Sequence, residues 1–376
     1  MYKILHFADL HLETSFAADN LSSSVGNWRR SDLRATLGRI FTLARERQVD
    51  AVTIGGDLFD QNYAAPSLVV FLKQQFTRLA PSRVFIVPGR HDPYTNSSMY
   101  ALNDWPNNVT IFSQSKLTAA KIAPNIHLWG AAHPPLKEHV YLDGIKVDNQ
   151  GINILLLHAA DGAQNQDTFS ITGPTVKSAN FDFALLGSQH HGALWPDEKP
   201  YCVYPGSPEP LSIEEADSSH YVVLLTINEE GCHPELISIN QWRYTNLEID
   251  LSCCETAEEV ARRVKEPLNA GKTADERLIA RVKLTGQPDL LVDVRTITEM
   301  VETKAHLQFE PQFGVKYDLA QLSQELTVRG TLVRKSLERL RLVQGDQERH
   351  TLLNSLYVAL RALEGKQVPL FHEVVE

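Results

Sequence analysis

Five short clusters of carboxylate and imidazole side chains each follow a segment with the composition of a buried strand. The clusters are Asp9-Leu10-His11, Gly55-Gly56-Asp57-Leu58-Phe59-Asp60, Gly89-Arg90-His91-Asp92, His158, and Gly187-Ser188-Gln189-His190-His191. Mixed imidazole and carboxylate ligands suit manganese, iron or zinc. Two such ions about 3.5–4 Å apart, bridged by one carboxylate, would neutralise a phosphodiester and lower the pKa of a bound water. The set therefore predicts a divalent-metal centre at the rim of a sheet, with a further histidine to protonate the leaving oxygen.

Each cluster taken alone also has an ordinary structural interpretation. An Asp-x-His pair is more often a turn or a helix cap than a pair of ligands, and Gly-Gly-Asp after a strand is commonly a tight turn. His158 alone would be a hydrogen-bonded core histidine, and His190-His191 alone would be surface. Five independent turns would not place these side-chain types at successive strand ends, so the joint pattern favours the metal centre.

The elements that must position these clusters alternate along the first 240 residues or so. Buried strands are predicted for short runs, rich in β-branched or aromatic residues, at residues 4–7, 51–54, 84–87, 152–157 and 183–186. Apolar residues at helical spacing predict helices over residues 31–47 and 67–79. Strands that alternate with helices predict a layered α/β domain whose strand-end loops carry the chemistry.

The pattern changes after about residue 240. Thr256-Ala257-Glu258-Glu259 is a capping box, which predicts the start of a helix. Apolar and polar residues then alternate over residues 278–285, as in a half-exposed strand, and the chain reads as helical from Asp318 onward. We therefore predict three regions, with boundaries at 1–240, 241–316 and 317–376.

The clusters resemble those of the calcineurin-like metallophosphoesterases, whose pattern is Asp-x-His, Gly-Asp-x-x-Asp, Gly-Asn-His-Asp, a lone His and Gly-His-x-His. Within that superfamily the chain is similar to the SbcD-type double-strand-break-repair exonucleases, especially their bacterial YhaO-like branch. The local matches are Phe7-Ala8-Asp9-Leu10-His11-Leu12, Gly56-Asp57-Leu58-Phe59-Asp60, Val87-Pro88-Gly89, Asp104-Trp105-Pro106, Tyr204-Pro205-Gly206-Ser207-Pro208, Arg281-Val282-Lys283-Leu284-Thr285-Gly286 and Leu360-Arg361-Ala362-Leu363-Glu364-Gly365. The resemblance implies an α/β fold: a metallophosphoesterase α-β-β-α sandwich, then a small α+β capping domain and a helical C-terminal segment.

The resemblance also implies a role for each matching residue. The metal ligands would be Asp9 and His11 at a first site completed by His190, Asp57 as the bridge, and His158 at a second site. His91 would be the catalytic histidine beside the phosphate and the leaving group, with Asp92 orienting it. The implied cofactor is Mn²⁺, with one complete site.

Two positions depart from the family pattern, and both belong to the second metal. Arg90 stands where the family has Asn, and a guanidinium has no acceptor atom and remains cationic. Ser188 stands where the family has the first His of Gly-His-x-His. Three consequences stay open. Arg90 replaces the second cation and clamps a phosphate oxygen, or His191 swings in as a substitute ligand, or the nuclease is weakened or inactive.

The resemblance implies Mn²⁺-dependent hydrolysis of DNA phosphodiesters, as an exo- or endonuclease of a DNA repair or DNA-defence complex. The alternative is a weakened DNA-binding or scaffold subunit of an SMC-like ATPase complex. A small-nucleotide phosphodiesterase is disfavoured because the second and third regions would then lack a task. The implied partners are DNA and a coiled-coil ATPase docked on the C-terminal helices, and a homodimer is left open. Basic residues that could contact DNA phosphates are Arg29, Arg30, Arg34, Arg334, Lys335, Arg339, Arg341 and those of residues 272–283, although a solvated helix face is the default interpretation of such runs.

The composition limits the classes of function. The chain has 376 residues, of which 43% are apolar and 22% charged, so disorder and coiled-coil arrays are poor interpretations. The formal charge, 36 basic minus 46 acidic residues or −10, argues mildly against nucleic acid unless metal ions or a basic patch hold it. Four cysteines without CxxC spacing argue against a zinc ribbon and favour a reduced cytosol. No apolar run approaches a membrane span, so we expect a cytoplasmic protein without membrane contact.

Overall fold

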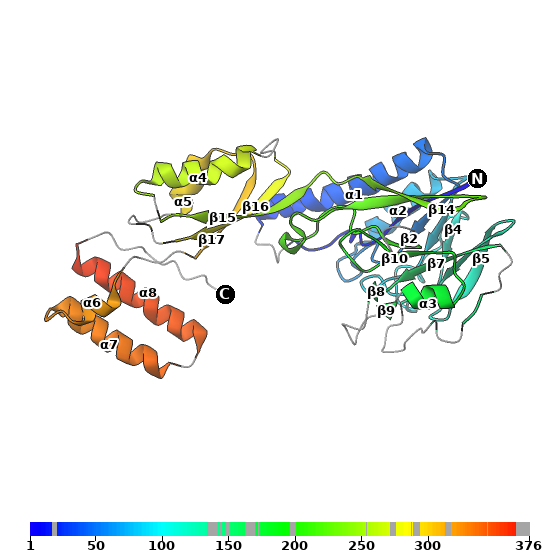
Figure 1. Cartoon of the computed structure of the whole chain (residues 1–376). Coiled ribbons are helices and arrows are strands. Elements are labelled where there is room, and N and C mark those ends of the chain that lie inside the picture. Colours follow the sequence, from blue (N-terminus) through cyan, green and yellow to red (C-terminus); the bar gives the residue numbers. More distant parts are fainter. Residues whose placement is uncertain are drawn as a thin grey trace. The chain divides into compact units, whose positions relative to one another are not determined.

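The structure is a computed structural model that describes residues 1–16, 21–133, 142, 145–147, 151–161, 170–171, 173–195, 201–252, 254–270, 276–286, 288, 294–312, 317–343 and 345–365. These residues belong to two compact units, Met1–Tyr244 and Thr245–Glu376 (Figure 1). The predicted boundaries at 240/241 and 316/317 stay predictions. No helix in the described part of the chain is both long and apolar enough to cross a membrane.

Two six-stranded sheets form the centre of the first unit. The first sheet has the spatial order β14 (Gly231–Ser238), β13 (Tyr221–Asn228), β1 (Tyr2–Phe7), β2 (Ala51–Ile54), β3 (Arg83–Ile86) and β4 (Val109–Ile111). The second has the order β11 (Ala193–Trp195), β12 (Cys202–Tyr204), β10 (Phe183–Gly187), β7 (Ile152–His158), β6 (Ile126–Gly130) and β5 (Thr118–Ala123). A two-stranded sheet pairs β8 (Ala160–Asp161) with β9 (Ser170–Ile171).

Within each sheet, the strands that carry the predicted clusters run parallel to one another. In the first sheet β1 pairs with β2 and β2 with β3, and in the second β7 pairs with β10, all in parallel register. Parallel strands bring their carboxyl ends to one edge of a sheet, so the clusters of each sheet gather there. All five predicted strands are confirmed to within two residues at either end.

Helices cover the outer faces of the two sheets, and the inner faces pack on each other. The covering helices are α1 (Ser23–Glu46), α2 (Pro66–Thr77) and α3 (Gly173–Ser178), and a 3₁₀ helix, η2 (Ile213–Glu215), lies between β12 and β13 in the chain. Successive residues of a strand face opposite sides, and Leu5 accordingly packs with α1 and α2 while Ile4 packs against residues of the second sheet. On the far side of the second sheet, Leu157 and Leu186 pack with Val176 of α3. The predicted α-β-β-α order is therefore confirmed.

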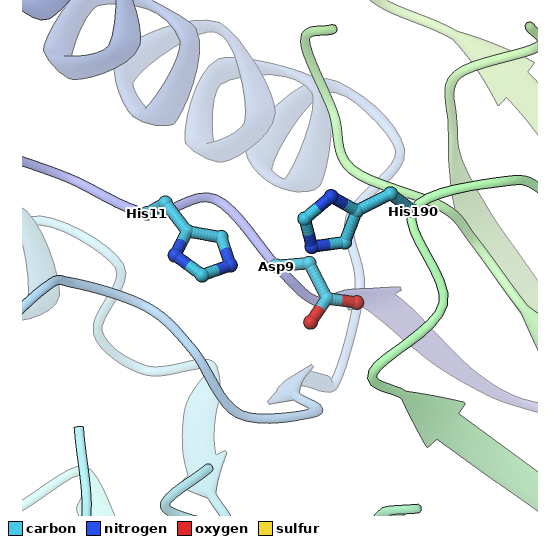
Figure 2. A group of neighbouring side chains, drawn as sticks. All are labelled: Asp9, His11 and His190. Carbon is cyan, nitrogen blue, oxygen red and sulfur yellow. The ribbon is translucent and has the colours of Figure 1, made fainter. Parts of the chain in front are cut away.

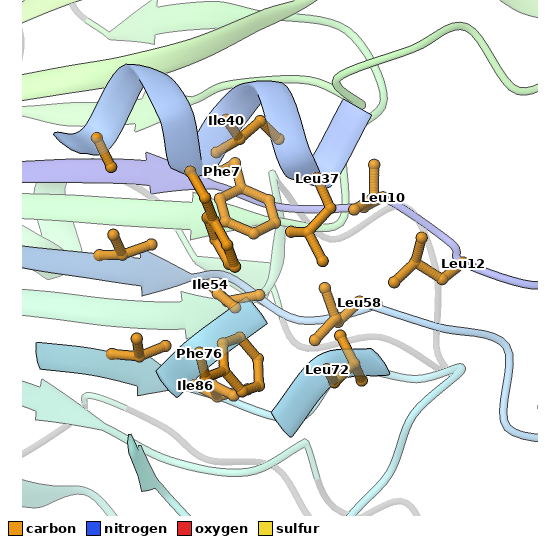
Figure 3. Packing of buried hydrophobic residues seen from close by; sticks show 14 of the residues in the cluster. Phe7, Leu10, Leu12, Leu37, Ile40, Ile54, Leu58, Leu72, Phe76 and Ile86 are labelled. Carbon is orange, nitrogen blue, oxygen red and sulfur yellow. The ribbon is translucent and has the colours of Figure 1, made fainter. Parts of the chain in front are cut away.

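The core between the helices and the first sheet is aromatic and aliphatic throughout. Figure 3 shows Leu37 and Ile40 of α1 and Phe76 of α2 directed toward Phe7 and Ile54 at the ends of β1 and β2. These side chains have no solvent exposure. Burial of such a side chain stabilises the fold by about 1.5–3 kcal/mol relative to exposure. The carboxyl ends of β1 and β2, which precede the metal-type side chains, are thereby held in place.

Helix α1 begins at Ser23, earlier than the predicted start at residue 31. The Ser22 hydroxyl caps the helix by accepting a hydrogen bond from the Val25 backbone N–H at 3.4 Å. The first turns bury polar as well as apolar side chains, so their apolar spacing is too sparse to predict a helix. One of these is Arg29, which is fully buried.

The burial of Arg29 corrects its suggested role as a phosphate contact. Its guanidinium lies 4.8 Å from the ring centroid of Phe16 and 4.7 Å from that of Trp242, and it donates to the Pro210 carbonyl. Arg34 donates through Nε to the Glu13 carboxylate at 2.8 Å. Arg29 is therefore a packing residue of the first unit that does not reach DNA.

The second unit begins with a three-stranded sheet of order β15 (Arg243–Asp250), β16 (Leu278–Thr285) and β17 (His306–Pro311). Helices α4 (Ala257–Ala270) and α5 (Val294–Val301) lie on one face of this sheet (Figure 1). The predicted helix start is confirmed, because the Thr256 hydroxyl accepts from the Glu259 N–H at 3.3 Å. The predicted strand over residues 278–285 is also confirmed.

Three further helices follow, α6 (Leu319–Ser323), α7 (Val328–Leu342) and α8 (Asp346–Leu363). They share a small core of Leu322, Val333, Leu356 and Leu360. Arg334 donates to the backbone carbonyls of Ser323 and Glu325, whereas Lys335, Arg339 and Arg341 are exposed. Lys283, on β16, lies 3.9 Å from the Glu248 carboxylate, and Lys272 lies outside the described residues.

Candidate metal centre

The loops that follow β1, β2, β3 and β10, together with the last residue of β7, bring their carboxylates and imidazoles to one place. Three overlapping groups have ligand atoms within 4.8 Å of one another, and among the described residues they are Asp9–His11–His190, His11–Asp57–His91 and Asp9–Asp57–His158. Figure 2 shows Asp9 between the rings of His11 and His190. Asp9, His11 and Asp57 each belong to two groups, so the six residues form one continuous cluster.

The backbone around the cluster is held in conformations that non-glycine residues seldom adopt. Asp9, His11 and Asp57 have φ values of 53°, 48° and 49°. The Asp9 N–H donates to the Gly56 carbonyl at 3.1 Å, and the His11 N–H donates to the Asp57 carbonyl at 3.0 Å. Left-handed backbone costs of order 1–3 kcal/mol per residue and concentrates at functional sites. The strained loops of β1 and β2 hold each other in place.

Gly89 leaves room for the Asp57 carboxylate. A Cβ at this position would lie 2.3 Å from the Asp57 Oδ1 atom, so any side chain would displace that carboxylate. The His91 N–H donates to the same oxygen at 2.7 Å. The loop after β3 is thereby fitted closely around the predicted bridging ligand.

Three of the imidazoles are anchored through Nδ1. The Nδ1 atom of His11 lies 2.7 Å from Asp60 Oδ1, that of His158 lies 2.9 Å from the Gly55 carbonyl, and that of His190 lies 2.8 Å from Glu215 Oε1. These acceptors hold a proton on Nδ1, so in the neutral ring the lone pair lies on Nε2. Such outer acceptors are usual for histidines that bind metals.

One buried nitrogen shows that the cluster fits a cation. His11 Nε2 is buried without a hydrogen-bond partner among the described residues, and the Asp57 carboxylate lies 3.6 Å from it. His158 Nε2 lies 3.4 Å from the same carboxylate. A buried polar atom without a partner is costly, and a divalent ion between these atoms would satisfy it. The donor set of nitrogen and carboxylate oxygen suits Mn²⁺, Fe²⁺ or Zn²⁺.

Without a metal, protons supply the positive charge of the cluster. Burial opposes charge on His11, but the hydrogen bond to Asp60 and the charge of Asp57 outweigh it and raise the pKa of His11 to about 9. Burial also opposes charge on His158, and Asp57 and Asp9 raise the pKa of His158 to about 10. Burial works to raise the pKa of Asp57, but the neighbouring imidazolium groups, His158 foremost, lower it.

We expect the apparent affinity for Mn²⁺ to rise with pH. His11 is protonated at neutral pH and must lose this proton to bind a metal, so affinity rises up to about tenfold per pH unit for each proton displaced. The stability of the metal-free fold changes with pH in the opposite direction. The raised pKa values of His11 and His158 stabilise this fold fully below about pH 6.5 and progressively less up to pH 9–10. Titration calorimetry between about pH 6.5 and 8.5, in buffers of different ionisation enthalpy, measures both the affinity and the protons released. An affinity that does not change with pH would contradict these pKa values.

The predicted pairing of Asp92 with His91 is wrong. Asp92 is fully buried, and its carboxylate accepts hydrogen bonds from the backbone N–H groups of Asp57, Leu58 and Gly89 and from the Tyr100 hydroxyl. It thus fastens the loop after β3 to the loop after β2. The carboxylate nearest to the His91 imidazole among the described residues is that of Asp60, 3.5 Å from Nδ1.

The two positions that depart from the family pattern lie beside the cluster, and neither belongs to a ligand group. Ser188 contributes its backbone, because its N–H donates to both carboxylate oxygens of Asp9, at 3.1 and 2.9 Å. Arg90 and His191 are exposed. His158 shares its group with Asp9 as well as Asp57, so the second position has one more carboxylate nearby than the sequence predicts.

Sequence reasoning missed Asp60 as an anchor and Glu215 altogether. Glu215 accepts from His190 through Oε1 and from the Ser207 hydroxyl through Oε2, the latter at 2.8 Å. It follows His190 by 25 residues on η2, outside any strand-end cluster. Only the Tyr204-Pro205-Gly206-Ser207-Pro208 match, which contains Ser207, pointed toward this segment.

Replacing Glu215 by glutamine is expected to lower the affinity for Mn²⁺ by about 10- to 100-fold, because an amide binds the Nδ1 proton less strongly and lets the His190 ring turn. Isothermal titration of the full chain measures the change. The control is Glu235→Gln, which removes a carboxylate that is 54% exposed and pairs with Arg47. Equal affinity in Glu215→Gln and in the control would show that His190 is not a ligand.

Comparison with known proteins identifies the family of this site. The family model of the calcineurin-like phosphoesterases matches residues 2–197, which are 196 of the 376 residues. The chain belongs to this family. The resemblance drawn from its motifs is thus confirmed, and the chain is a metallophosphoesterase of a family that binds divalent metals.

The chain is also similar to individual proteins. An uncharacterized metallophosphoesterase of Bacillus subtilis (strain 168), YhaO, is 26% identical over 234 residues, which cover 59% of this chain and 57% of that protein. The match thus spans less than two thirds of that relative's length. A dimetal phosphatase from Danio rerio is 13% identical, with a TM-score of 0.42, covering 63% of this chain and 99% of its own. A protein of Thermus thermophilus is 15% identical, with a TM-score of 0.36 and coverage of 62% and 98%.

Proposed function

We propose that this chain is a Mn²⁺-dependent DNA phosphodiesterase with an altered second metal position. The observation that carries the proposal is the cluster of Asp9, His11, Asp57 and His190 beside the exposed Arg90 and His91. A cation held by these ligands, together with a guanidinium, forms a positive site for a phosphodiester in a chain whose overall charge is negative.

A polymeric substrate is supported by the rim of the site and by the second unit. The His91 side chain is 50% exposed. Tyr63, on the loop that carries Asp57 and Asp60, is 63% exposed, as expected of a ring on which a base could stack. The second unit has hydrophobic cores of its own. Hydrolysis of a small nucleotide would leave this second unit without a function.

Separate residues would bind the metal ion and donate the proton during hydrolysis. Asp9, His11, Asp57 and His190 would hold a divalent ion, which supplies charge neutralisation and lowers the pKa of water. His91 is placed to hand a proton to the departing sugar oxygen, since its Nδ1 lies near Asp60 and its ring lies 4.8 Å from that of His11. Burial lowers the pKa of His91, and an anionic phosphodiester beside it would raise that pKa again.

Arg90 would take the place of the second cation. Its guanidinium stays charged, and its planar fork suits two phosphate oxygens at once. It precedes His91 directly, so a phosphate bound by Arg90 lies within reach of the catalytic imidazole. His158 would then remain hydrogen-bonded to the Gly55 carbonyl with Asp57 beside it.

The double replacement Arg90→Asn with Ser188→His is expected to raise the tightly bound Mn²⁺ from one to two per chain. It removes a fixed cation and adds an amide oxygen and an imidazole beside Asp57 and His158. Metal analysis after dialysis measures the stoichiometry, with Arg30→Asn as a control that removes a partly exposed cation of α1 instead. Two ions in the unmodified chain would overturn the one-metal arrangement.

The experiment that tests the function is cleavage of labelled linear DNA. The purified chain is incubated with Mn²⁺, alone and with any ATPase encoded beside it, next to a His91→Ala control. We expect cleavage that depends on Mn²⁺ and on His91. Cleavage that survives the loss of His91 indicates a contaminant, and hydrolysis of small nucleotides without DNA cleavage would overturn the proposal.

A non-catalytic DNA-binding or scaffold subunit is the second candidate, favoured by Arg90 and Ser188 at two ligand positions. A partner on the C-terminal helices is supported by apolar side chains around α7, since Leu326, Val328 and Leu342 are 99%, 74% and 81% exposed. We propose a coiled-coil ATPase for this surface. Absence of DNA cleavage with every divalent metal, with or without the ATPase, would favour the scaffold.

A further inference from the structure

We propose that residues 207–217 couple the strand leading into the second unit to the metal ligand His190. Metal binding would then tighten the anchorage of that strand, and a shift of that strand would change metal affinity. This segment joins β12 to β13 and contacts both places through buried hydrogen bonds. The inference concerns metal binding and the described residues of the first unit, and it does not depend on DNA being the substrate.

At the metal centre, the segment holds His190 through two contacts, one to its backbone and one to its ring. The Ser207 N–H donates to the His190 carbonyl at 3.1 Å, and Glu215 accepts from the His190 ring at 2.8 Å. The Ser207 hydroxyl joins the two contacts by donating to Glu215 Oε2. Ser207 is fully buried, and Glu215 is 5% exposed. The direction of the His190 ring therefore depends on where this segment lies.

At its other contact, the segment holds residues 241–244. Glu209 accepts from the backbone N–H of Gln241 at 3.0 Å and from that of Trp242 at 3.0 Å. The Asp217 N–H donates to the Tyr244 carbonyl at 3.1 Å. Tyr244 is the last residue of the first unit, and β15 continues from it into the second unit.

The buried hydrogen bonds of Glu209 make it unfavourable for residues 241–242 and residues 207–217 to move separately. Glu209 is fully buried, and burial raises its pKa despite the hydrogen bonds from the Trp242 and Gln241 backbone. Its carboxylate also accepts from Arg39 at 2.6 Å and from the Thr36 hydroxyl at 3.0 Å. A buried carboxylate that loses donors is strongly destabilised, so residues 241–242 and the segment must move together.

The strand side of the contact is equally constrained. Trp242 is fully buried, and its indole N–H donates to Asp32 at 2.6 Å. Its ring lies 4.8 Å from that of Trp28. Packed cores shift between discrete arrangements and do not deform continuously. A displacement of β15 is therefore expected to displace residues 207–217 as well.

Coupling of this kind is reciprocal, which gives a test on the unmodified chain. Mn²⁺ bound at His190 should slow hydrogen exchange of the Gln241 and Trp242 amides, which Glu209 holds. Exchange measured by mass spectrometry on a peptide covering residues 239–244, with and without Mn²⁺, reports this effect. We expect slower exchange with Mn²⁺, and no such slowing in Glu215→Gln at the same saturation of metal. Unchanged exchange on metal binding would overturn the coupling.

The converse test replaces Glu209 in the full chain. Glu209→Gln is expected to lower Mn²⁺ affinity by about 2- to 30-fold in calorimetry. Leu72→Ala, which opens a cavity in the α2 core and touches neither contact, controls for general loss of stability. An equal loss of affinity in both variants, or none in Glu209→Gln, contradicts the proposal. Trp242→Phe, which removes the indole N–H donor to Asp32 on the strand side of the contact, provides the same measurement if Glu209→Gln does not fold.

Discussion

Replacing Asp57 by asparagine is expected to abolish tight Mn²⁺ binding and to lower phosphodiester hydrolysis by about 10³-fold or more. Asp57 belongs to two of the three ligand groups, and both His11 and His158 approach its carboxylate. A metal ion supplies several kcal/mol of transition-state stabilisation, and each 1.36 kcal/mol is a factor of ten in rate. Calorimetry with Mn²⁺ and initial rates on a phosphodiester measure the two effects together.

The matched control for Asp57→Asn is Asp104→Asn, which changes an exposed carboxylate by the same chemistry. The control should bind Mn²⁺ and hydrolyse substrate as the unmodified chain does. Asp57→Asn also replaces one of the two carboxylate oxygens near the His91 N–H by an amide nitrogen, so its fold is checked by circular dichroism. Full metal binding in a folded Asp57→Asn chain would place the metal elsewhere.

Replacing His91 by alanine is expected to lower kcat by about 10²- to 10⁴-fold, the usual contribution of a general acid or base, with metal content unchanged. The side chain of His91 is half exposed, whereas His11 and His158 are buried among carboxylates. Its backbone N–H holds Asp57, and alanine keeps this bond. Metal analysis and steady-state rates on the same preparation separate chemistry from metal binding.

The alternative for His91 is visible in the structure, since His11, Asp57 and His91 form one of the ligand groups. A His91→Ala chain that loses its Mn²⁺ would show that this histidine is a ligand. His233→Ala is the control, because that imidazole lies on β14 beside Asn228 and contacts no residue of the cluster. It should leave both the rate and the metal content unchanged.

The sequence predicts the strands and the clusters well because both follow from local rules. Apolar runs such as residues 51–54 are completely buried. The polar residues that follow such runs lie at the ends of the strands, outside the hydrophobic core. The joint occurrence of Asp9, Asp57 and His158 at strand ends then indicates one site. The strands β4 and β5 carry mostly partly exposed residues, and only pairing with neighbours makes them strands.

What the sequence does not predict depends on contacts between distant residues. Asp60 and Asp92 both follow a strand, and only the tertiary structure shows that Asp60 faces the imidazoles while Asp92 faces the backbone. Arg29 reads as an exposed cation because nothing local reveals the rings of Phe16 and Trp242 that cover it. Glu215 meets His190 across 25 residues for the same reason.

The most direct test of the metal centre is a crystal structure of the full chain soaked with Mn²⁺, with anomalous difference maps recorded at the manganese edge. We predict one strong peak bounded by Asp9, His11, Asp57 and His190, and the Arg90 guanidinium free to meet a phosphate. A peak away from these four side chains, or no peak at saturating Mn²⁺, would contradict the account. A second peak of equal height between Asp57 and His158 would contradict the single-metal arrangement.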